Sequence, residues 1–274
     1  MTALVERPDL SARTILSKSA LVTADLCGSK AWYEIHDRRK LIPAENITFG
    51  SAVDAGVEQI LTMRRAGLSI DERRFMSAAA EIATRDDIEV DLDEIERALS
   101  QFVLVVMPNY DFGFCALQLA IREDLDGLGE AEGHPDVVLQ DGSIFDVKTS
   151  KRSKPADAAA TSIELGFYAL LAEAEGGTVP RVGYWTWVRT AKPMWQTLET
   201  PVTDEMRRRA YELAAAYMRA KRADEILNRK ADTPQNFTFP SGPKNLGLCG
   251  TCQYNPAVGG PCRLAVQGGE SDAA

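Results

Sequence analysis

Apolar residues recur at helical spacing through the N-terminal part of the chain, residues 10–108. This period predicts helices over Leu10–Trp32, Phe49–Arg65, Asp71–Arg85 and Leu92–Met107. The first is expected to end near Cys27-Gly28. In the second, Gly50, Ala52 and Gly56 would let a neighbouring element pack closely.

Short runs of β-forming residues replace the helical period in residues 109–200. The predicted strands are Phe112–Arg122, Asp136–Gln140, Ile144–Lys148, Arg181–Arg189 and Met194–Leu198. Gln140–Ser143 is a hairpin turn, and a helix about Ala156–Glu175 precedes the last two strands.

The C-terminal part, residues 201–274, contains a long basic helix over Thr203–Asn228 and a Gly- and Pro-rich end over Thr233–Ala274. We therefore expect one α/β domain over residues 1–274. It combines an N-terminal helical part, a core of a small mixed sheet flanked by helices, and a cysteine-stapled C-terminal segment.

Composition limits the classes of function. The 274 residues are 45% hydrophobic and 26% charged, as is ordinary for a soluble globular protein. No apolar run reaches membrane-span length and no signal-peptide pattern is present, so a cytoplasmic protein without membrane contact is expected. With only two histidines, His36 and His134, chemistry that needs a histidine cluster is excluded.

The net charge of −9 is unevenly distributed. Residues 1–147 hold 14 Lys and Arg against 27 Asp and Glu, whereas residues 148–263 hold 17 against 11. Because salt screens charges beyond roughly 8 Å, the basic half can bind phosphates locally.

Two carboxylates and a lysine dominate the predicted hairpin. Asp136 begins its first strand, and Asp146 and Lys148 end the second, so the turn brings them to the same end. Residues two apart leave the same face of a strand. A divalent cation such as Mg²⁺ or Mn²⁺ would relieve the carboxylate repulsion. The alternative is a surface ion pair between Asp146 and Lys148, with Asp136 as a turn residue.

Five cysteines lie at positions 27, 115, 249, 252 and 262. The odd count, without an export signal, argues against a disulfide framework. Cys249, Cys252 and Cys262 have the spacing of a metal-binding knuckle, with a fourth ligand to come from Cys27 or Cys115. Because Cys115 lies on a predicted strand, a buried structural thiol is favoured there. Four thiolates suit either zinc or an iron–sulfur cluster.

Pro135-Asp136 followed by Asp146-Val147-Lys148 resembles the motif of the PD-(D/E)XK nucleases, particularly the RecB-like branch. The resemblance implies a restriction-endonuclease-like core. It also implies that Asp136, Asp146 and the Val147 carbonyl bind the catalytic metal, and that Lys148 assists the attack of water on the phosphodiester.

Two further motifs resemble this branch with one substitution each. Gly50–Asp54 is similar to a Gly-x-x-x-His motif whose His binds the metal, so Asp54 takes the place of that ligand. Glu164–Tyr168 is similar to a Gln-x-x-x-Tyr motif that contacts DNA near the scissile phosphate. A carboxylate at position 164 repels phosphate unless it is protonated or metal-bound.

The cysteines also resemble those of iron–sulfur members of the branch, which include AddB-type helicase–nucleases and the exonuclease of CRISPR adaptation. The resemblance implies that Cys27, Cys249, Cys252 and Cys262 hold a [4Fe–4S] cluster that joins the two chain ends.

The leading hypothesis is a metal-dependent exonuclease acting on DNA ends or single-stranded DNA. Basic residues after Lys148 and on the helix carrying Arg207–Arg222 would follow the DNA backbone. Trp185 and Trp187 are expected in the core, with base stacking as the alternative. No helicase motif is present, so recombination, replication-associated repair, phage recombination and CRISPR adaptation are all compatible pathways. No oligomeric state is predicted.

Two alternatives follow from the same residues. The replaced His and Gln favour a catalytically decayed iron–sulfur module that binds DNA or a partner. A zinc-stapled, site-specific endonuclease is the other.

Overall fold

The computed structural model describes residues 15–36, 45–85, 88–113, 115–124 and 129–227, together with residues 252, 254 and 262. Its helices are α1 (Lys18–Leu26), α2 (Gly28–His36), α3 (Glu45–Arg65), α4 (Glu72–Ala83), α5 (Leu92–Gln101), α6 (Ile163–Ala174) and α7 (Asp204–Leu227). A π-helical turn (Phe102–Val106) and a 3₁₀ turn (Met107–Asn109) extend α5. The described helices include none that is both long and apolar enough to span a membrane.

The described strands form two mixed sheets. One has the order β2 (Ala116–Leu117), β5 (Val137–Val138), β6 (Ile144–Ser150), β7 (Arg181–Val188) and β8 (Met194–Pro201). Only β6 and β7 pair in parallel there, because α6 crosses between them. The smaller sheet has the order β1 (Ile15–Ser17), β4 (Glu130–Gly133) and β3 (Ile121–Asp124). The predicted α/β class is confirmed, but the smaller sheet was not foreseen.

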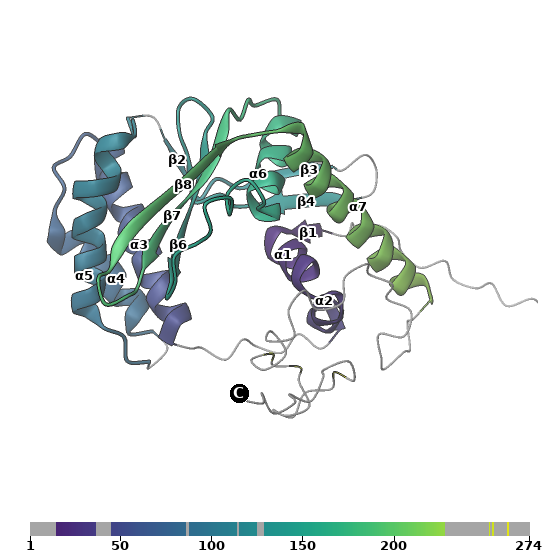
Figure 1. The fold of residues 1–274 in the computed structure, drawn as a ribbon, viewed down its shortest axis with the longest axis horizontal. Helices are drawn as coiled ribbons and strands as arrows, with labels where there is room; N and C mark the ends of the chain where they lie inside the picture. Colours follow the sequence, from purple (N-terminus) through teal and green to yellow (C-terminus); the bar gives the residue numbers. More distant parts are fainter. Residues whose placement is uncertain are drawn as a thin grey trace, which may run out of the picture.

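The larger sheet separates two groups of helices (Figure 1). Phe145 and Val147 of β6 pack in one core with residues of α3, α4 and α5. Ile144 of β6 packs in another core with residues of α6. Since side chains alternate along a strand, Asp146 and Lys148 share the α6 side with Ile144. The alternation thus directs the acidic and basic residues of β6 away from the large aromatic core.

Glycines let α3 approach its neighbours, as the sequence predicts. A β-carbon on Gly50 would lie 3.0 Å from Thr149 Oγ1 of β6, and one on Gly56 would lie 2.4 Å from a methyl of Leu99 in α5. Both positions therefore favour glycine for steric reasons. The close approach at Gly50 brings the turn of α3 that carries Asp54 toward β6.

Several element boundaries differ from the predictions. The helix expected over Leu10–Trp32 is wrong at Ile15–Ser17, which pairs with β4 as a strand. The predicted end near Cys27-Gly28 is confirmed, because α1 ends at Leu26 and the extended Cys27 separates it from α2. The strand expected over Phe112–Arg122 is divided, and Gln118, with φ of 48°, follows its first part.

The helix before β7 begins at Ile163 instead of Ala156. Ser162 caps it by accepting a hydrogen bond from Leu165 N at 3.0 Å, and turns occupy residues 156–161. Residues 156–161 have a helix-forming composition, but the extended conformation of Ser162 prevents the helix from continuing into them.

The predicted core positions of Trp185, Trp187 and Cys115 are confirmed. Both tryptophans are 0% exposed and Cys115 is buried. Base stacking by either indole is therefore wrong, because neither ring reaches solvent.

Candidate active site

The β5–β6 hairpin brings Asp136 beside Asp146, as predicted. Val137 pairs with Phe145 in the antiparallel register, so the residue before Val137 lies opposite the residue after Phe145. Leu139 N donates to Ser143 O at 2.8 Å to close the turn, and Gly142 adopts a positive φ of 85° within it. A side chain at Gly142 would collide with the Thr178 carbonyl, so the tight turn requires glycine there.

Backbone and side-chain donors hold Asp136 in place. Its Oδ2 accepts a hydrogen bond from Val147 N at 2.7 Å, and its Oδ1 accepts one from Gln118 Nε2 at 3.1 Å. Burial, followed by the charge of Asp54, raises the pKa of Asp136 to about 6 despite the opposing effects of Lys148 and these hydrogen bonds. Each Asp136 oxygen keeps a further lone pair for another ligand.

Asp146 is almost fully buried, with 1% of its surface exposed. It forms an ion pair with Lys148, yet neither of its oxygens has a hydrogen bond of good geometry. Burial raises the pKa of the Asp146 carboxyl, and the two neighbouring carboxylates Glu164 and Asp136 raise it further against the effect of Lys148. A buried carboxylate whose only partner is one ammonium group is costly to the fold.

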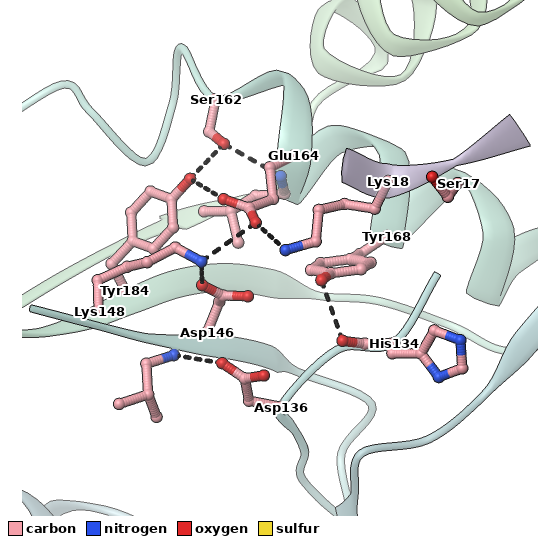
Figure 2. Close-up of polar contacts among 12 residues, drawn as sticks. Ser17, Lys18, His134, Asp136, Asp146, Lys148, Ser162, Glu164, Tyr168 and Tyr184 are labelled. Carbon is pink, nitrogen blue, oxygen red and sulfur yellow. Dashed lines mark hydrogen bonds and ion pairs between the residues drawn. The ribbon is translucent and has the colours of Figure 1, made fainter. Parts of the chain in front are cut away.

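Glu164 is a hub for three donors (Figure 2). Its Oε1 lies 2.6 Å from Lys18 Nζ and 3.2 Å from Lys148 Nζ. Its Oε2 accepts a hydrogen bond from Tyr184 OH at 3.1 Å. Burial works against the ionised form, but Lys148 and Lys18 together lower the pKa of Glu164 below its usual value. The carboxylate is thus charged and compensated by cations, a condition that the local sequence does not reveal.

The charges of the candidate site also act on Asp54 of α3. Burial raises the pKa of Asp54 to about 6, and the charges of Asp146 and Glu58 add to the shift. Asp54 also raises the pKa of Asp136. Asp54, Asp136 and Asp146 thus affect one another's ionisation, and we call these three carboxylates the acidic centre.

The oxygen donors at this centre suit a hard divalent cation. Asp146 offers a buried Oδ1 without a partner and a buried Oδ2 that pairs with Lys148. Burial raises the pKa of the Asp54 and Asp136 carboxyls, and the charge of a neighbouring aspartate adds to each shift. Within the described ranges, no three Asp, Glu, His or Cys side chains are already grouped tightly enough to hold a metal ion. A cation would have to draw these carboxylates together and share Asp146 with Lys148.

Tyr168 is fully buried and its hydroxyl donates to the His134 carbonyl at 3.0 Å. The hydrogen bond ties α6 to the segment that leads into Asp136. Burial raises the pKa of Tyr168, so the phenol stays protonated and remains a donor. This arrangement favours a supporting role for Tyr168 over direct contact with DNA.

Sequence reasoning missed Lys18, Tyr184 and Gln118. The register pairs Asp146 with Tyr184, so strand alternation could have placed the phenol on the Asp146 side once β6 and β7 were known to be adjacent. No local signal marks Lys18 or Gln118, because each reaches the site from a distant element.

Two C-terminal cysteines lie close to α2. Tyr33 of α2 stacks on Tyr254 with ring centroids 5.2 Å apart, and this cluster includes Cys262 and the partly buried Cys252. Cys262 N donates to Tyr254 O at 2.8 Å. Cys27 directly precedes α2, whereas Cys249 is outside the described residues. Cys252, Tyr254 and Cys262 therefore form one cluster with Tyr33 of the helix that follows Cys27.

Two arginines of the basic helix α7 form ion pairs with carboxylates. Arg207 pairs with Glu173 and Asp204, and Arg208 pairs with Glu205 and Glu212. Such pairs reduce the positive potential that these two arginines offer to a phosphate.

We expect Asp54→Asn to stabilise the metal-free protein at neutral pH. The folded-state pKa of about 6 exceeds the ordinary value of 3.8, so the folded state binds more protons and becomes more stable as the pH falls from above 6 toward 4. Removing the charge should contribute on the order of 1 kcal/mol, or about 2–4 °C in Tm.

The check is the Tm of EDTA-treated protein at about pH 7.5 and pH 5.5. Wild type should gain more on acidification than Asp54→Asn, and exposed Glu96→Gln should behave as wild type. Equal gains in wild type and Asp54→Asn would contradict the assignment.

Comparison with known proteins identifies a family and solved structures of low sequence identity. A family model described as the PD-(D/E)XK nuclease superfamily matches residues 15–257. A Eubacterium rectale protein described as a "putative exonuclease" is 15% identical, with a TM-score of 0.48 and coverage of 80% of this chain and 85% of that chain. The protein SSO0001 is 11% identical, with a TM-score of 0.36 and coverage of 91% and 96%. No curated protein matches the chain.

Proposed function

Because the chain belongs to the PD-(D/E)XK nuclease superfamily, we propose that it is a metal-dependent DNA exonuclease acting on ends or single strands. The observation that supports metal dependence is the buried Asp146 carboxylate, whose Oδ1 has no partner and whose Oδ2 pairs only with Lys148. A carboxylate in this condition, beside two more with raised pKa values, has the chemistry of a ligand for Mg²⁺ or Mn²⁺.

Asp54, Asp136, Asp146 and the Val147 carbonyl would hold this ion. The bound cation supplies a Lewis acid that polarises the phosphate and makes water more acidic. Asp136 keeps its orientation through Val147 N and Gln118. Lys148 is protonated, since Asp146 and Glu164 raise its pKa, so it acts as a cation toward the phosphate and an orienting donor for water instead of a base.

The direct test is degradation of labelled DNA by purified protein with Mn²⁺ or Mg²⁺. Linear duplexes and single strands should be shortened from an end, circles should survive, and EDTA should stop the reaction. Loss of circles at the same rate would refute end-dependence, whereas inertness on every substrate would refute the nuclease activity.

Lys154 provides a prediction about substrate binding. Its ammonium lies 4.6 Å from the centre of the Tyr184 ring, and its backbone exchanges two hydrogen bonds with Gln196. If this lysine contacts a DNA phosphate, Lys154→Met should weaken binding and reduce the slope of log K against log salt by about 1. Fluorescence anisotropy across a salt series measures the slope, and an unchanged slope would contradict the contact.

We also propose that Cys27, Cys249, Cys252 and Cys262 hold a [4Fe–4S] cluster. The packing of Cys252 and Cys262 beside Tyr33 supports this set, since α2 begins directly after Cys27. The cluster would be structural, because thiolate sites contribute their binding energy to folding.

Anaerobically purified protein should be brown, with a broad absorbance at about 400 nm. Cys262→Ser should lose the colour, whereas Cys115→Ser should keep it because Cys115 lies in the separate core of α3 and the sheet. A colourless protein with stoichiometric zinc would exclude the cluster and favour the zinc-stapled alternative. A brown but catalytically inert protein would favour the DNA- or partner-binding module.

A further inference from the structure

Lys18 makes a long-range contact with the candidate site. It is the first residue of α1, directly after the Ser17 cap, and its Nζ lies 2.6 Å from Glu164 Oε1. The two residues are 146 positions apart in the sequence. Their side chains are only 25% and 12% exposed, so water screens the pair less than it screens a surface ion pair.

Lys18 and Lys148 share one oxygen of Glu164. Lys148 Nζ is 3.2 Å from Glu164 Oε1, which is longer than the contact of Lys18 with the same atom. Both ammonium groups therefore compensate the charge of Glu164, Lys148 first and Lys18 next. Lys148 also keeps its ion pair with Asp146, and it therefore stays beside the acidic centre.

The alternative for Glu164, a neutral protonated acid, is disfavoured by its surroundings. Two ammonium groups and the Tyr184 hydroxyl all donate to its oxygens. The pKa of Glu164 is lowered by the two lysines. Glu164 is thus a negative charge beside Lys148, the cation that under the proposed function faces the phosphate.

We propose that Lys18 is a positioning residue that neutralises Glu164, so that this carboxylate neither repels the DNA phosphate nor draws Lys148 away from it. The inference rests on the proposed nuclease function. Lys18 acts through Glu164 and Lys148, and its own contact with the substrate is not required.

The proposal predicts a specific epistasis between two substitutions. Lys18→Met leaves Glu164 undercompensated, and kcat/KM for DNA should fall about ten- to a hundredfold. Glu164→Gln removes the charge that Lys18 compensates. The Lys18→Met/Glu164→Gln double variant should therefore match Glu164→Gln alone and exceed Lys18→Met. Lys18→Arg retains the charge and should stay within a few-fold of wild type, at about threefold or less.

DNA binding without divalent cations gives a readout independent of catalysis. Fluorescence anisotropy should show weaker binding by Lys18→Met and recovery in the double variant. Lys192→Met is the matched control, because Lys192 is an exposed lysine on the β7–β8 turn and should change neither measurement. Thermal melting of each variant identifies any loss of fold, and Lys18→Gln tests the charge if Lys18→Met fails to fold.

The possible outcomes separate the hypotheses. If Lys18→Met loses the same factor in the wild-type background and in the Glu164→Gln background, Lys18 contacts DNA directly and the positioning role is refuted. Full activity of Lys18→Met would refute it as well. An inactive wild type would refute the nuclease function instead, while the binding measurements would still report on the Lys18–Glu164 coupling.

Discussion

Asp146→Asn should lower the DNA cleavage rate by about a thousandfold or more, because it removes the ligand charge and the acceptor that pairs with Lys148. The same substitution should raise the Tm of the metal-free protein. Asp146 is 1% exposed, and burial with the charges of Glu164 and Asp136 raises the pKa of its carboxyl despite the effect of Lys148. Its ionised form is therefore costly when no metal cation is bound. Opposite signs for activity and stability are typical of a functional residue.

Single-turnover cleavage with saturating Mn²⁺ measures the first effect, and melting in EDTA measures the second. Asp141→Asn is the matched control, since Asp141 is an exposed carboxylate on the turn of the same hairpin. A loss of activity accompanied by a lower Tm would indicate misfolding, and retained activity would remove Asp146 from the catalytic site.

Trp185→Ala should destabilise the protein by about 3–5 kcal/mol, which corresponds to a fall in Tm of about 10 °C or more. The indole is 0% exposed and stacks on Phe145 with ring centroids 4.6 Å apart and planes within 8°. Three further aromatic rings, those of Phe102, Tyr110 and Phe112, contact it. Removing it leaves a cavity directly behind the strand that carries Asp146.

Trp185→Phe should cost much less than the alanine variant, because phenylalanine keeps an aromatic ring against Phe145. Met194→Ala, at a 55% exposed position on β8, should stay within about 0.5 kcal/mol of wild type. Chemical unfolding of the three variants checks the order. Equal losses for Phe and Ala at position 185 would show that the ring stacking is not the source of stability.

The hairpin was predictable because its information is local. Pairing across a tight turn and the alternation of side chains are sufficient to bring Asp136, Asp146 and Lys148 together. The aromatic core was predictable for a similar reason, since Trp185 and Trp187 occupy alternate positions of one strand.

Lys18 was not predictable, because its neighbour Glu164 is determined by how α1 docks on α6 and not by any spacing along the chain. The strand Ile15–Ser17 was missed for the same reason. It is only three residues long and depends on a parallel partner, β4, far along the sequence. The expectation that Glu164 repels phosphate left out the two lysines that compensate its charge. The effect of a carboxylate on a phosphate depends on the cations around it, and these come from distant parts of the sequence.

The Glu164 hub has a consequence for how the molecule reaches its active form. Its partners come from α1, β6 and β7, and the Lys18 contact closes a loop of 146 residues. Contacts of such high sequence separation form late, after the ordering cost of the intervening chain has been met. A growing polypeptide acquires the acidic hairpin before it acquires Tyr184 in β7, so the hub can form only once synthesis has passed that strand. The full set of Glu164 contacts therefore requires that β6 and β7 have paired.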